Sequence, residues 1–192
     1  MRKLASGLAA AALTALAACG GAQTPTPTPY ANPDWGFGAT FPGKPTVTET
    51  QASATSAHSL LVEANVGGDD FAINVIDAST AEGMPSEILD RAQKVLADSQ
   101  QLDVGANNPV PLGAITGREV RFDKDGKPVM LSRLFMINGE LYEVNATSQK
   151  GVTDPSVKAF LDSFHLVAGP TPPATPAANA PAANAPAANA AP

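Results

Sequence analysis

The sequence has few of the residues from which catalytic and metal centres are built. Its 192 residues include one cysteine and two histidines, so it can form neither an intramolecular disulfide framework nor a Cys/His zinc site. The 12 Lys and Arg are outnumbered by 18 Asp and Glu, which argues against a nucleic-acid-binding protein, because such proteins carry a basic patch. No nucleophile–base or phosphate-binding pattern occurs at a diagnostic spacing. We therefore expect no catalytic site, no cofactor and no metal.

The first residues have the character of an export signal. Arg2 and Lys3 precede an apolar run that ends at Leu16, which is shorter than the roughly 20 residues needed to cross a bilayer. A basic start, an apolar run and small residues before a cleavage point are typical of a secretory signal peptide, here residues 1–18.

The end of this segment, Leu16-Ala17-Ala18-Cys19, resembles the lipobox of bacterial lipoproteins. In that family the cysteine sulfur receives a diacylglycerol and the cysteine becomes the new N-terminus. The resemblance implies that Cys19 carries acyl chains such as palmitate and anchors the protein to a membrane of the cell envelope. Gly20 in place of Asp implies the periplasmic face of the outer membrane if the source is Gram-negative. The alternative is an ordinary secreted protein with an incidental cysteine.

Two low-complexity stretches flank one candidate domain. Residues 19–33 contain a Thr-Pro repeat, which predicts an extended tether after the lipidated cysteine. Residues 170–192 contain no charged or aromatic side chain and close on an Ala/Pro/Asn near-repeat, which predicts a disordered tail. That tail is either a spacer or the product of neutral drift. Residues 34–169, which hold every acidic side chain, are expected to form a single domain.

Hydrophobic periodicity within this domain predicts strands, a helix, more strands and a second helix. Alternating apolar residues favour strands at 35–41, 47–53, 58–66 and 71–75. Helical spacing follows over 85–102, and residues 105–113 have the composition of a loop. Three strands at 115–122, 128–137 and 140–148 form a meander, and Asp154-Pro155 begins a second helix. The expected class is α+β, with a mainly antiparallel sheet of about six to seven strands and two main helices packed on it.

Short motifs in these elements look familiar. They are Trp35-x-Phe37-x-x-x-Phe41-Pro42-Gly43-Lys44-Pro45, Gly117-Arg118-Glu119, Arg133, Leu141-Tyr142 and Phe160-Leu161-Asp162-Ser163-Phe164. Together they resemble a group of uncharacterised bacterial secreted and lipoprotein domains that is similar to the PsbP-like fold. The resemblance spans about residues 35–167 and implies an α/β/α sandwich used for binding within larger assemblies, without implying any ligand residue.

Two arginines are expected to lie together on the meander. The Asn138-Gly139 turn predicts that Phe135 pairs with Tyr142, which places Arg133 on the same face as that tyrosine. We expect the preceding hairpin to place Arg118 on this face as well.

Arg118, Arg133 and Tyr142 are therefore a candidate site for a small anion, since a guanidinium suits a carboxylate or a phosphate. The alternative is that these arginines pair internally, with Asp162 as the first candidate partner and Glu63 as another.

The other face of the meander is a candidate partner surface. Methionine and leucine side chains are expected there, partly covered by a helix and otherwise exposed, and clustered Met and Leu can form a binding surface. The residues that carry this hypothesis are Met130, Met136 and Leu141. Glu119, Arg121 and Glu143 are expected to share the face as ordinary cross-strand charges.

The sequence thus favours a lipid-anchored, non-catalytic binding or assembly module of the cell envelope. Its expected contacts are the membrane, through Cys19, and an envelope protein. The alternative is a sensor or binding domain for a small anionic ligand that uses the arginine-lined site.

Overall fold

The computed structural model describes residues 26–168, which form two antiparallel sheets and two helices. Cys19, the predicted signal peptide and the predicted tail lie outside the described residues. The larger sheet has seven strands in the order β3-β4-β5-β9-β8-β7-β6. In chain order these strands are β3 (Thr46–Thr50), β4 (Ser59–Val66), β5 (Asp69–Asp77), β6 (Asp103–Leu112), β7 (Ile115–Lys124), β8 (Lys127–Ile137) and β9 (Glu140–Thr147).

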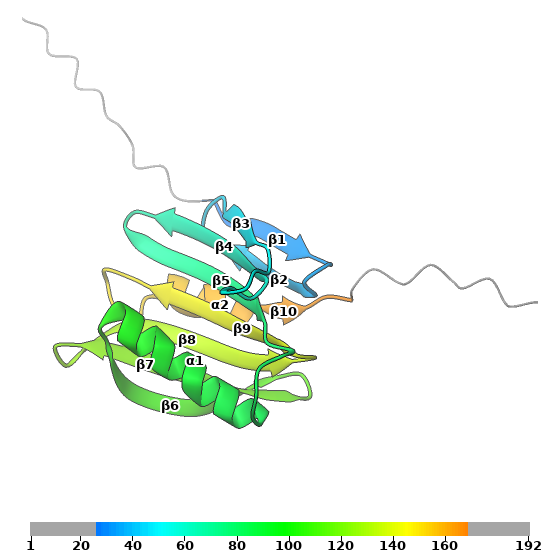
Figure 1. The fold of residues 1–192 in the computed structure, drawn as a ribbon. Coiled ribbons are helices and arrows are strands. Elements are labelled where there is room, and N and C mark those ends of the chain that lie inside the picture. The colour runs from blue at the N-terminus through cyan, green and yellow to red at the C-terminus, as the bar shows by residue number, and fades with distance from the viewer. Residues whose placement is uncertain (1–25, 169–192) are drawn as a thin grey trace, which may run out of the picture.

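The two faces of this sheet are covered by different elements. Helix α1 (Pro85–Gln100) packs on β7 and β8 from one side, and Figure 1 shows it lying across that half of the sheet. On the other side, α2 (Pro155–Ser163) packs beside a small sheet made of β1 (Thr28–Asn32), β2 (Phe37–Phe41) and β10 (His165–Leu166). The predicted α+β class, with a mainly antiparallel sheet and two helices, is confirmed.

Each face of the large sheet has its own hydrophobic core. The core beneath α2 and the small sheet is aromatic, with Phe37, Phe41, Phe71 and Phe160 almost fully buried. The core beneath α1 is aliphatic apart from one phenylalanine, and it contains Leu89, Ala92, Val120, Phe122, Met130, Leu134 and Leu141. The two cores fix the helices on opposite faces of one sheet.

Both helices begin where the sequence predicts. Pro85 opens α1, and the Glu87 carboxylate accepts a hydrogen bond of 2.7 Å from the backbone N–H of Met84. Pro155 opens α2, and the Asp154 carboxylate accepts one of 2.8 Å from the N–H of Ser156. These caps satisfy backbone donors that the first turn of a helix leaves free. Neither helix within residues 26–168 combines the length and apolar character that a membrane crossing requires.

The β8–β9 hairpin also forms as predicted. Asn138 and Gly139 both have positive φ, 53° and 88°, as a tight two-residue hairpin turn requires. Ile137 pairs with Glu140, and Phe135 with Tyr142. Arg133 pairs with Val144, so its predicted place on the same face as Tyr142 is confirmed.

The β7–β8 hairpin contains an irregularity that differs from the register predicted from the sequence. Asp123 pairs with Pro128, but the residue before it in β7, Phe122, pairs with Met130. Val129, between Pro128 and Met130, therefore has no partner on β7. A bulge of this kind adds one residue to one strand. Because side chains alternate between faces, this single residue reverses which residues of β7 share a face with those of β8.

Three strands lie in segments for which the sequence predicts no strand. β1 falls in the predicted tether, so the folded region begins before Asp34; it pairs with β2, and the Tyr30 ring lies 5.9 Å from that of Phe37. β6 occupies the predicted loop and pairs with β7 at the edge of the sheet, where its prolines are tolerated because an edge strand leaves some donors unused. β10 is a two-residue strand on β2.

Candidate functional site

The predicted arginine site is not assembled in the structure. The register pairs Glu119 with Arg133 and Arg118 with Leu134, so Arg118 lies on the α1 face and Arg133 on the α2 face. The expectation that both share a face is wrong because of the bulge at Val129. The same bulge separates Glu119 and Arg121, on the α2 face, from Glu143, on the α1 face.

Arg133 is held in an internal ion-pair network. Its Nε donates to Glu119 Oε2 and its Nη2 to Asp162 Oδ1, both at 2.8 Å. The prediction that Asp162 is its internal partner is confirmed, whereas Glu63 pairs with neither arginine. The pKa of Asp162 is lowered, mainly by its hydrogen bond from Lys158 and further by Arg133. Both ends of the Arg133 guanidinium are therefore neutralised within the domain.

Arg118 has an equivalent role on the opposite face. It forms an ion pair with Asp90 on α1, and its Nη2 donates to the backbone oxygen of Ser86 at 3.1 Å. These contacts join β7 to the first turns of α1. They pair the Arg118 guanidinium with a carboxylate inside the domain.

Tyr142 lies in the aromatic core rather than in a site. The residue is 2% exposed, and its hydroxyl lies 2.9 Å from the backbone oxygen of Trp35 and 2.5 Å from Glu140 Oε2. Burial, together with the Glu140 carboxylate, raises the pKa of this phenol. Its hydroxyl therefore donates a structural hydrogen bond.

The predicted partner surface is largely covered. Met130 and Leu141 are 4% and 6% exposed, in the core beneath α1, and Met136 packs against that core. The face is a helix-binding face, because α1 supplies the apolar cover that its Met and Leu side chains need.

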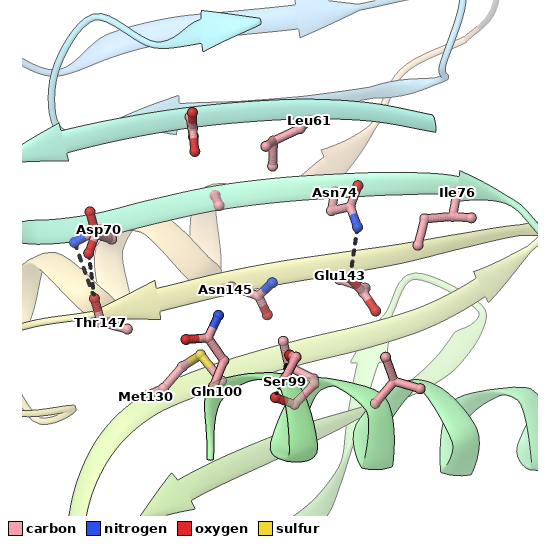
Figure 2. A pocket seen from close by; sticks show the side chains of 14 residues that line it. Leu61, Asp70, Asn74, Ile76, Ser99, Gln100, Met130, Glu143, Asn145 and Thr147 are labelled. Carbon is pink, nitrogen blue, oxygen red and sulfur yellow. Dashed lines mark hydrogen bonds between the residues drawn. The ribbon is translucent and has the colours of Figure 1, made fainter. Parts of the chain in front are cut away.

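An open groove remains where α1 does not reach. The helix packs on β7 and β8, so the adjoining part of the same face, over β4, β5 and β9, borders a cavity of about 550 Å³ beside the C-terminal half of α1. Figure 2 shows this groove with the sheet on one side and the end of α1 on the other. Apolar side chains of its lining include Leu61, Ile76 and Met130. We call this cavity the α1–β5 groove.

Glu143 is the most deeply buried charged residue of the groove. It is 9% exposed, and its Oε2 accepts a hydrogen bond of 2.9 Å from Asn74 Nδ2, the contact drawn in Figure 2. Within the described residues it forms no ion pair, and its Oε1 accepts no hydrogen bond. Burial raises the pKa of this carboxyl, although the Asn74 hydrogen bond opposes the rise.

Further polar groups line the groove beside Glu143. Ser132 Oγ donates to Asn145 Oδ1 at 2.5 Å, which fixes the orientation of that amide and leaves its Nδ2 as a donor without a partner among the described residues. Asp70 and Thr147 lie further along, with the Asp70 backbone N–H donating to Thr147 Oγ1 at 3.2 Å. The sequence contains a signal for these polar lining residues: in β5 and β9, polar residues alternate with the apolar residues of the aromatic core.

The two histidines have structural contacts. His58 Nε2 lies 2.7 Å from Glu49 Oε1, and its ring packs 4.7 Å from that of Trp35. His165 Nδ1 lies 2.8 Å from the backbone oxygen of Ser163. Among residues 26–168 no group of three His, Cys, Asp or Glu side chains is placed to hold a metal ion.

Comparison with known proteins identifies the fold. No protein-family model and no curated protein matches the chain. The solution structure of cyanobacterial PsbP (CyanoP) from Synechocystis sp. PCC 6803 superposes with a TM-score of 0.53 at 12% sequence identity, covering 79% of this chain and 98% of CyanoP. At this identity the likeness concerns architecture alone. The domain therefore has a PsbP-like fold.

Proposed function

We propose that this protein is a lipid-anchored binding or assembly module of the bacterial cell envelope, without catalytic activity. The anchor is Cys19, whose preceding residues Leu16, Ala17 and Ala18 match the lipobox. The partner binds in the α1–β5 groove. The groove is the observation that carries the proposal, because it is an open cavity of about 550 Å³ with both apolar and polar lining, as ligand sites have.

The contacts of the other candidates favour this function over the alternatives. Arg118 and Arg133, which a sensor of small anions would use, each have carboxylate partners inside the domain. Neither His58 nor His165 hydrogen-bonds a hydroxyl or a thiol in the part of the chain that the structure describes. A histidine acting as a general base for a side-chain nucleophile would need such a contact.

The anchor is tested by metabolic labelling with an alkyne-tagged palmitate. We expect the full-length protein to carry the label and to sediment with membranes, and Cys19→Ala to lose both properties. Labelling that persists in Cys19→Ala would contradict the assignment of the anchor.

The binding function is tested by photo-crosslinking in the native cells. Val95 lines the groove and is 65% exposed, whereas Val104, 44% exposed, lies on β6 at the far edge of the sheet and serves as the matched control. A crosslinker at Val95 should trap one recurrent envelope protein that the same crosslinker at Val104 does not trap. Equally diffuse products from both positions would contradict a binding function of the groove.

A further inference from the structure

The α1–β5 groove has charge of one sign only. Its charged lining residues are Glu63, Asp70 and Glu143, and no lysine or arginine is among the lining residues. Acidic side chains at a concave surface focus a negative potential that attracts a cation.

Glu143 adds a more specific feature, because it is buried without a positive partner. It is nine-tenths buried, and Figure 2 shows its side chain in the groove, where only Asn74 is bonded to it. A buried carboxylate is ordinarily paired with a cation, since taking it out of water is costly. Its Oε1 accepts no hydrogen bond within the described residues and is accessible from the groove, so a group bound there would supply the missing charge.

The surroundings of Oε1 favour an ammonium group on an alkyl chain. Asn74 already takes one acceptor position on Oε2, so the pair of free oxygens that a guanidinium binds best is incomplete, whereas an ammonium is a point charge that needs one acceptor. Leu61 and Met130 line the same groove and give apolar surface to an alkyl chain, as a lysine stem requires. The free Nδ2 of Asn145 is a donor suited to a peptide carbonyl.

We infer that the groove recognises a lysine side chain of a polypeptide partner, with the ammonium on Glu143 and a backbone carbonyl on Asn145. This inference rests on the proposed function and specifies the chemistry of the partner. A small diamine shares the ammonium chemistry but has no carbonyl for Asn145.

The inference is tested by NMR titration of the full-length chain in uncharged detergent micelles. The probe is Nα-acetyl-lysine N-methylamide, followed through the side-chain amide signals of Asn74 and Asn145. We expect saturable shifts of both signals. The norleucine analogue, which has nearly the same chain without the charge, should produce none, and equal shifts from both analogues would overturn the inference. Cadaverine should shift Asn74 and leave Asn145 unmoved; a shift of Asn145 by cadaverine would overturn the assignment to a polypeptide.

Two variants separate direct contact from general attraction. Glu143→Gln keeps the shape of the side chain and an acceptor for Asn74, and should weaken binding by about tenfold or more, since it removes one charge-assisted hydrogen bond. Glu63→Gln removes an equal charge from an exposed position in the groove and should weaken binding less than threefold. Equal effects of the two variants would overturn the role of Glu143.

Negative results from the titration and from the crosslinking experiment have different meanings. A partner trapped from Val95 without lysine-dependent shifts would overturn the ammonium inference and leave the binding module standing. The absence of a Val95 adduct together with the absence of shifts would contradict both the ammonium inference and the binding function of the groove.

Discussion

Replacing Arg133 with methionine is predicted to lower the stability of the domain, because this residue joins its own strand to a neighbouring strand and to a helix. Its two hydrogen bonds of 2.8 Å join β8 to Glu119 on β7 and to Asp162 on α2. Its side chain is 15% exposed, while those of Glu119 and Asp162 are 29% and 43% exposed. The charges are thus shielded on the arginine side and accessible to water on the carboxylate side.

The magnitude follows from these exposures. A hydrogen bond to a charged group contributes about 1.5–3 kcal/mol when shielded, but an exposed ion pair contributes less than about 1 kcal/mol. Methionine keeps the apolar stem, and the two carboxylates regain water when the guanidinium is removed. We expect a loss of about 2 kcal/mol in the free energy of unfolding for Arg133→Met, or about 6 °C in melting temperature for a domain of this size.

The assay is thermal unfolding followed by circular dichroism at pH 7. Arg121→Met is the matched control, because Arg121 is 40% exposed and pairs with Asp123 on its own strand; we expect it to lose under 1 kcal/mol. The lowered pKa of Asp162 means that its contribution to stability is present above its ordinary value of 3.8 and is lost as the pH falls through the lowered value. The effect of Arg133→Met should therefore shrink in acid. An unchanged melting temperature at pH 7 would refute this reasoning.

Three further predictions concern buried side chains. Burial raises the pKa of the Glu143 carboxyl above its ordinary value of 4.5. The neutral carboxyl is therefore compatible with folding below pH 4.5, and stability is lost as the pH rises through the raised pKa. Glu143→Gln should melt above the wild type at pH 7 and equal it below about pH 4. A lower melting temperature at pH 7 would refute the account of that carboxyl. Tyr142→Phe should cost about 1 kcal/mol in urea unfolding, since it removes the hydroxyl that donates to the Glu140 carboxylate or the Trp35 carbonyl; no change would show that the hydroxyl stabilises nothing. Met130→Ala should cost about 2–5 kcal/mol in the same assay, because Met130 fills the core beneath α1. Almost no loss of stability would show that Met130 is a surface residue and contradict its place in that core.

Local chemistry explains what the sequence predicts well. The Asn138-Gly139 turn determines the register of β8 and β9, because few residue pairs adopt positive φ at both turn positions. Asp154 and Pro155 determine the start of α2 through a cap and a fixed φ. The Arg133–Asp162 pair was also predictable, since a shielded arginine needs a carboxylate.

The position of Arg118 was not predictable from such signals. The hairpin turn at Asp125 and Gly126 resembles the one at Asn138, but the strand after it contains an extra residue, Val129. Pro128, directly before Val129, is a local signal for a bulge, because a proline inside a sheet cannot donate to a neighbouring strand, but it does not determine which residue is left unpaired. One unpaired residue was enough to separate the two arginines of the predicted site.

The remaining differences concern tertiary context. The proline-containing β1 and β6 have the composition of tether and loop, and they become strands because β2 and β7 offer free edges. The alternation in β9 places Glu143 on a polar face, but the extent to which α1 covers that face depends on how the helix packs. The groove therefore emerges only in three dimensions.

The central claim, that the α1–β5 groove is the binding site, is tested most directly by one comparison in the native cells. A photo-crosslinker at Val95 is introduced into the full-length protein with either glutamate or glutamine at position 143. We predict a discrete adduct with the wild-type groove and a loss of most of it with Glu143→Gln at equal protein levels. An adduct of equal yield in both backgrounds, or no discrete adduct with the wild-type groove, would contradict the account.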